Sequence, residues 1–111
     1  ALIIIVVAVL FLVWRMKPTK GVRSISAHQL KQELNDSNKV YIDVRTPAEF
    51  KARNIKQFKN MPLGSDLSKL PKDKEIIVIC QSGMRSAQAC KQLKKLGYEK
   101  VTNVRGGIGS Y

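Results

Sequence analysis

Residues 75–88 read EIIVICQSGMRSAQ, and this stretch decides the fold. An apolar run over residues 75–79 predicts a buried strand that lies near the centre of a sheet. Small and polar residues follow, and a helical pattern then extends over residues 86–96 until Gly97 stops it. The unit therefore predicts a strand, a tight loop and a helix, with Cys80 at the point where the strand ends.

Working outward from this unit, strand and helix patterns alternate along the chain. The second helix begins with a capping box, because Thr46 precedes Pro47 and Glu49 stands three residues after the cap. The expected strands cover residues 39–44 and 101–104, the expected helices cover 26–34 and 46–53, and turns are expected at 60–64, 66–70 and 105–107. This alternation predicts an α/β domain with a largely parallel sheet.

Two chemically active side chains stand at predicted strand ends. Ligand sites in parallel sheets lie beyond the carboxyl ends of the strands, where both Asp43 and Cys80 fall. The helix start at Ser86, the curl that Gly83 permits and the charge of Arg85 all favour a thiolate at Cys80. A free cysteine is more often a buried core residue, and we assign that ordinary role to Cys90.

Four motifs in order resemble the rhodanese family of sulfurtransferases. The family loop is commonly Cys-Arg-Ser-Gly-x-Arg-Ser, and residues 80–86 read CQSGMRS. Residues 41–50, 60–62 and 105–108 are similar to the family's Asp-Val-Arg, Asn-hydrophobic-Pro and Gly-Gly patterns. The resemblance covers about residues 22–111 and implies a three-layer fold with a mostly parallel central sheet.

The resemblance implies a persulfide carried on Cys80, and it assigns roles to the neighbouring residues. The expected anion-binding loop consists of Gln81, Ser82, Gly83, Met84, Arg85 and Ser86. Structural support is expected from Asp43, Arg45 and Glu49, whereas Arg85 is either an electrostatic aid or a clamp paired with an acid. No metal and no cofactor are expected.

Two features of the loop bear on the substrate. Four residues separate Cys80 from Arg85, one fewer than in the related phosphatases, which favours a sulfane sulfur over a phosphoryl group. The expected donor is thiosulfate or a persulfide, and Gln81, which stands where the family often has a second arginine, argues against strong use of a dianionic donor such as thiosulfate. Expected acceptors are a thiol, cyanide or a partner protein. The alternative hypothesis is a non-catalytic, membrane-tethered module that binds or regulates a partner.

The first residues, ALIIIVVAVLFLVW, carry no charge, and Trp14 stands where an interfacial aromatic residue belongs. We expect a transmembrane anchor over residues 1–16, a basic linker over 17–24 and the rhodanese-like domain over 25–111. The run is short for a span, since residues 1–14 make about 21 Å of helix. Cations follow the run and none precedes it, which predicts a single-pass protein of the cell membrane whose domain faces the cytoplasm.

The chain carries 20 Lys and Arg against 8 Asp and Glu, a formal charge of +12. Such a charge suits an anionic lipid surface or a nucleic acid. We favour the lipid surface because of the apolar N-terminal run, and we expect no nucleic-acid partner because no aromatic-interleaved basic stripe is visible.

Overall fold

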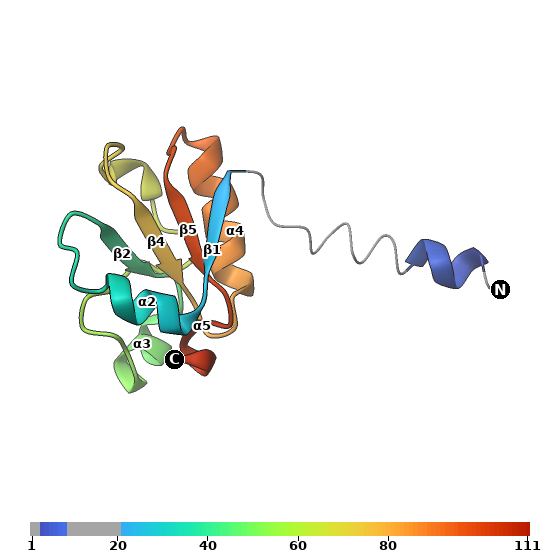
Figure 1. Ribbon diagram of the computed structural model, residues 1–111, viewed down its shortest axis with the longest axis horizontal. Coiled ribbons are helices and arrows are strands. Elements are labelled where there is room, and N and C mark those ends of the chain that lie inside the picture. Colours follow the sequence, from blue (N-terminus) through green and yellow to red (C-terminus); the bar gives the residue numbers. More distant parts are fainter. Residues whose placement is uncertain (1–2, 9–20) are drawn as a thin grey trace.

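The computed structural model describes residues 3–8 and 21–111, and the domain within it is built around one parallel sheet (Figure 1). Five strands lie in the order β1-β5-β4-β2-β3, and every neighbouring pair is parallel. The strands are β1 (Val22–Ile25), β2 (Val40–Asp43), β3 (Lys59–Asn60), β4 (Ile76–Ile79) and β5 (Val101–Val104). The predicted α/β class and the parallel sheet are confirmed.

Helices cover both faces of this sheet, which gives the three layers that the family resemblance implies. The helical elements are α2 (Ala27–Glu33), α3 (Pro47–Ala52), the 3-10 turn η1 (Leu67–Lys69), α4 (Met84–Lys95) and α5 (Gly107–Ser110). One core layer joins the sheet to α4 and η1, and the other joins it to α2 and α5. Figure 1 shows α2 and α4 on opposite sides of the strands.

The central strand is β4, as its composition predicts. All four of its residues are buried, because the sheet continues on both edges and helices cover both faces. Since Cys80 follows Ile79 directly, the most tightly packed element of the domain positions the thiol at its carboxyl end.

The caps of two helices form as the sequence indicates. The Thr46 side chain accepts a hydrogen bond from the Glu49 N–H, and the Glu49 side chain accepts one from the Thr46 N–H. The same reciprocal box joins Ser26 and Gln29 at the start of α2. Each box satisfies backbone donors that a helix start leaves unpaired, so both helices begin at fixed residues.

Four features differ from the sequence-based expectation. The strand β1 includes residues 22–24 of the expected linker, and its pairing with β5 places them in the sheet. A second short strand, β3, occupies Lys59–Asn60 beside β2, just before and at the start of the turn expected over residues 60–64. The helix α4 begins at Met84 rather than Ser86, and an unexpected short helix, α5, begins at Gly107, within the turn expected at residues 105–107.

The described part of the N-terminal run is a helix over residues 3–8 with exposed apolar side chains. Within residues 3–8 and 21–111 no helix has the length and apolar character needed to cross a membrane. The rest of the expected anchor and residues 17–20 of the expected linker lie outside the described residues, so the transmembrane helix gains no support from the structure.

Candidate active site

The loop after β4 curls tightly because of one glycine. Gly83 has φ +102°, a left-handed conformation that other residues adopt only under strain, and it caps α4. A side chain there would also meet the backbone N of Gly106 at 3.2 Å. The loop between Cys80 and α4 therefore depends on Gly83 both for its backbone angle and for its close packing against the next turn.

The sulfur of Cys80 lies inside this curl. The Gly83 N–H donates to Sγ at 3.0 Å, and the thiol donates to the Ser86 Oγ at 3.3 Å. Burial raises the pKa of the Cys80 thiol, but hydrogen bonds to its ionised form from Ser86, Gly83 and Ser82 outweigh burial. The pKa therefore lies below the ordinary value of a cysteine.

Ser86 connects the thiol to a residue that the sequence motifs do not contain. The Ser86 hydroxyl donates to Oδ1 of Asn103 at 2.5 Å, and Nδ2 of Asn103 donates to the Gly83 carbonyl at 3.4 Å. Asn103 belongs to β5, the strand beside β4, where it pairs in register with Val78. The only sequence signal for this role is an amide side chain within an otherwise mostly buried strand.

Arg85 forms an ion pair and does not point a free charge at the sulfur. Its two terminal nitrogens donate to the two carboxylate oxygens of Glu49 at 2.6 and 2.9 Å. Hydrogen bonds from Arg85 and Thr46 lower the pKa of Glu49 to about 2. Of the two roles expected for Arg85, this geometry is that of a clamp, and it ties the loop to α3.

A second ion pair lies beneath that clamp. Asp43 and Arg45 are both buried, and the Arg45 guanidinium donates to both Asp43 carboxylate oxygens at 2.8–3.0 Å. Arg45 also donates to the backbone carbonyls of Glu49 and Arg53. The pair therefore fixes α3 to the end of β2, which is the geometry expected of structural support.

The C-terminal turn, residues 105–111, packs directly against the cysteine loop. The Ile108 N–H donates to the Cys80 carbonyl at 2.9 Å, and the Gly109 N–H donates to the Gln81 carbonyl at 3.0 Å. Gly107 has φ +57°, and a side chain at this position would collide with both of those carbonyls. The turn thus holds the backbone that carries the thiol.

The remaining loop residues are largely open to solvent. Gln81 and Ser82 are exposed, and the Met84 side chain is 78% exposed at the start of α4. These residues make no side-chain bond to Cys80. The neutral Gln81 and the paired Arg85 leave the loop without a free cation, so an anion on the sulfur is stabilised by N–H and hydroxyl groups.

The second cysteine behaves as a core residue. Cys90 is completely buried on α4 and packs in the same core layer as Cys80. Burial and the nearby Cys80 charge raise the pKa of the Cys90 thiol to about 12, which leaves it protonated at neutral pH. Residues 3–8 and 21–111 contain no cluster of side chains that could bind a metal.

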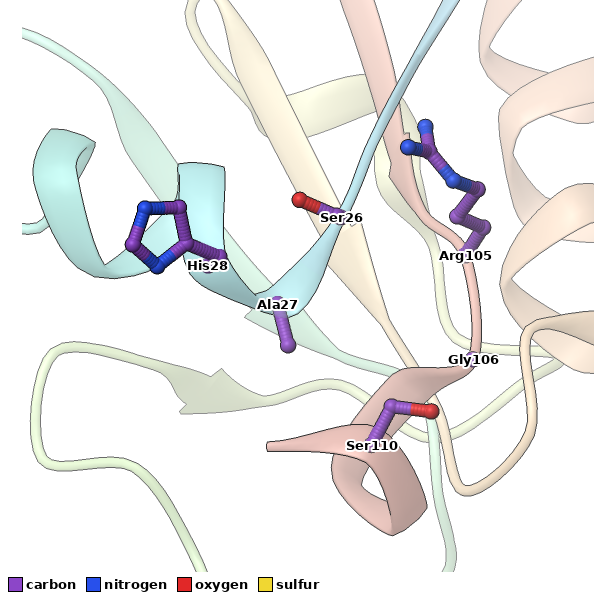
Figure 2. Close-up of a pocket in the computed structure, with 6 residues that line it drawn as sticks. All are labelled: Ser26, Ala27, His28, Arg105, Gly106 and Ser110. Atoms are coloured by element: carbon purple, nitrogen blue, oxygen red, sulfur yellow. The ribbon is translucent and has the colours of Figure 1, made fainter.

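An open pocket of about 430 Å³ lies beside the C-terminal turn (Figure 2). Figure 2 shows lining side chains from the start of α2, from the end of β5 and from α5. The residues are Ser26, Ala27, His28, Arg105, Gly106 and Ser110. Cys80 is not among them, so this pocket is separate from the thiol site.

Comparison with known proteins identifies the family to which most of the chain is similar. The family model described as "Rhodanese-like domain" matches residues 26–111. A "Sulfurtransferase" of Allochromatium vinosum is 40% identical over 91 residues, which cover 78% of this chain and 85% of that protein.

Two solved structures have the same fold. A rhodanese-like domain protein from Staphylococcus aureus superposes with a TM-score of 0.72 at 30% identity, over 79% of this chain and 89% of that one. A rhodanese-related protein from Thermoplasma volcanium superposes with a TM-score of 0.70 at 36% identity, over 79% of this chain and 88% of that one. Together with the match over residues 26–111, these findings show that the chain belongs to the rhodanese family.

Proposed function

We propose that this protein transfers sulfane sulfur through a persulfide on Cys80. Relatives named as sulfurtransferases at 37–40% identity support rhodanese-type sulfur transfer as the general activity. The observation that carries the proposal is the Cys80 sulfur itself, which accepts the Gly83 N–H at 3.0 Å within a curl that opens α4. Such donors stabilise both a thiolate and the terminal sulfur of a persulfide.

The reaction has two displacement steps. In the first, the Cys80 thiolate attacks the outer sulfur of the donor, a sulfur–sulfur bond forms, and the bond within the donor breaks so that its electron pair leaves with the anion. In the second, an acceptor thiolate attacks the outer sulfur of the Cys80 persulfide and releases the Cys80 thiolate. Because Cys80 is buried, its sulfur must become more exposed to meet the donor.

The charge around the loop favours a persulfide donor over thiosulfate. Thiosulfate is a dianion, and its binding benefits from cations that are free to pair with it. Here Arg85 already holds Glu49 through two hydrogen bonds, and Gln81 is neutral. A low-molecular-weight persulfide with one charge on its terminal sulfur matches the N–H groups of the loop better.

Mass spectrometry of the intact protein tests the transfer. After incubation with glutathione persulfide, the wild-type chain is expected to gain one sulfur atom, and a reductant is expected to remove it. Cys80→Ser should gain none, whereas the matched control Cys90→Ser should gain one, because Cys90 is buried and protonated. A wild-type chain that gains no sulfur from either a persulfide or thiosulfate would favour the non-catalytic binding module instead.

We also propose that residues 1–16 attach the protein to the cell membrane with the domain in the cytoplasm. Support comes from the uncharged sequence and from the exposed apolar side chains of residues 3–7. Cell fractionation tests this proposal: the full chain should stay with membranes after carbonate extraction, and a chain without residues 1–16 should not. A full chain that is released by carbonate would contradict it.

A further inference from the structure

We propose that Asn103 controls the reactivity of Cys80 by holding the hydroxyl proton of Ser86. The proposal rests on the proposed sulfur transfer through Cys80 and adds a positioning residue to it. Asn103 does not contact the sulfur; it acts through Ser86, which lies between the two side chains.

The direction of each hydrogen bond follows from the chemistry of the groups. Nδ2 of Asn103 donates to the Gly83 carbonyl, which fixes the amide so that Oδ1 faces Ser86. An amide oxygen only accepts, and a serine hydroxyl has one proton to give. The Ser86 proton therefore lies toward Asn103, and the Ser86 oxygen is left to accept from the Cys80 thiol.

In this arrangement the Ser86 hydroxyl serves only the thiol, whereas the Gly83 N–H can donate to the sulfur of the thiol and of the thiolate alike. When Cys80 loses its proton to water, Sγ becomes an acceptor, and the Ser86 hydroxyl must turn from Oδ1 toward Sγ to stabilise the new charge. Asn103 then loses its donor. Ser86 and Cys80 are both buried, so water does not readily replace either bond, and the two acceptors compete for a single proton.

Removing the competing acceptor should make Cys80 more acidic. Asn103→Leu keeps the approximate size of the side chain but leaves the Ser86 hydroxyl free to donate to the thiolate. From the net strength of one hydrogen bond, the pKa of Cys80 should fall by about 0.5–1 pH unit. A merely structural role for Asn103 would change stability without this shift.

The charged and titratable groups around Cys80 are the same in the wild type and in Asn103→Leu. They come from each element near the loop and comprise Arg85 and Cys90 on α4, Asp43 and Arg45 at the end of β2, Glu49 on α3, and Arg105 after β5. Because Asn and Leu are both uncharged, any shift in the titration of Cys80 reports hydrogen bonding and not a new charge.

The test is the pH dependence of Cys80 alkylation by iodoacetamide, followed in the full chain by peptide mass. It needs no sulfur donor, so its result is independent of whether sulfur transfer itself is found. Four proteins form a cycle: wild type, Asn103→Leu, Ser86→Ala and the double variant. Urea unfolding confirms that each is folded, and Asn103→Ala replaces Asn103→Leu if the larger side chain prevents folding.

We expect the pH midpoint of Cys80 alkylation to be lower in Asn103→Leu than in the wild type. We expect Ser86→Ala and the double variant to share one midpoint, because neither has a Ser86 hydroxyl for Asn103 to hold. In the reverse direction, Asn103→Asp should raise the midpoint, because a carboxylate holds the Ser86 proton more strongly and adds a negative charge. An unchanged or raised midpoint in Asn103→Leu would overturn the proposal. A fall of the same size between Ser86→Ala and the double variant would overturn it too.

Discussion

Gly107→Ala tests how strongly the C-terminal turn holds the cysteine loop. The new Cβ would lie 2.7 Å from the carbonyl carbon and oxygen of Gln81 and closer still to the Cys80 carbonyl oxygen, although Cβ contacts under 3.0 Å essentially never occur. The backbone of one segment must therefore move. That movement lengthens the bonds from Ile108 and Gly109 to the two carbonyls.

The expected loss of stability follows from two contributions. A left-handed conformation costs a non-glycine residue about 1–2 kcal/mol, and φ at Gly107 is +57°. Two weakened backbone hydrogen bonds add roughly 1–3 kcal/mol. The free energy of unfolding should therefore fall by about 2–5 kcal/mol, a large part of the total for a small domain.

Urea unfolding of a matched control separates the two contributions. Gly64 also has a left-handed conformation, with φ +100°, but a Cβ there would meet nothing within 4 Å. Gly64→Ala should therefore lose only the conformational part, about 1–2 kcal/mol, and keep normal alkylation of Cys80. Equal losses in the two variants would refute the argument that Gly107 is required for close packing against residues 80 and 81.

Three further predictions concern the side chains around the loop. The pKa of Glu49 is lowered from 4.5 to about 2 in the folded chain, so the Glu49–Arg85 ion pair stabilises the fold fully above pH 4.5 and progressively less as the pH falls toward 2. The free energies of unfolding of the wild type and Glu49→Gln, measured in urea, should therefore differ at pH 6 and converge near pH 2. A difference that does not change with pH would contradict this. Gln81→Arg should raise kcat/KM for thiosulfate relative to glutathione persulfide about 2- to 5-fold, as expected for one exposed cation, and an unchanged ratio would argue against the charge explanation of donor choice. Cys90→Ala should lower the free energy of unfolding by roughly 1 kcal/mol through lost packing while leaving sulfur uptake at Cys80 unchanged, and loss of that uptake would show that Cys90 takes part in the chemistry.

The sequence predicts the elements that local patterns determine. The run over residues 75–79 is apolar because β4 is buried on both faces, and the capping boxes at Ser26 and Thr46 encode helix starts within four residues. Likewise, the short spacing from Cys80 to Ser86 predicts a curled loop, and the hydrogen bond from the Gly83 N–H to the Cys80 sulfur forms within it.

The missed features depend on residues that are distant in sequence. The strand β1 buries only Ile25 fully and exposes Arg23 and Ser24, so no alternating pattern marks it, and its strand form comes from pairing with β5. The helix α4 starts at Met84 because Gly83, in a left-handed conformation, is its N-cap, and the close approach of Gly106 to Gly83 is a contact that no local signal shows.

The site shows the same division. The nucleophile and its loop follow from one continuous motif, but the partner of Arg85 lies 36 residues away and the partner of Ser86 lies 17 residues away. Side-chain pairs of this kind are created by the order of the strands in the sheet. Asn103 reaches Ser86 because β5 lies beside β4, and that order becomes visible only in the folded chain.

The central claim is that sulfur passes through Cys80, and a single-turnover experiment with an isotopically labelled donor tests it most directly. Glutathione persulfide that carries heavy sulfur in its outer position is mixed with the full chain, and excess donor is removed before an acceptor thiol is added. The account predicts one heavy sulfur on the peptide that contains Cys80, and then its appearance on the acceptor at the rate at which that peptide loses it. Labelled acceptor formed without label on Cys80, or in the Cys80→Ser chain, would contradict the account.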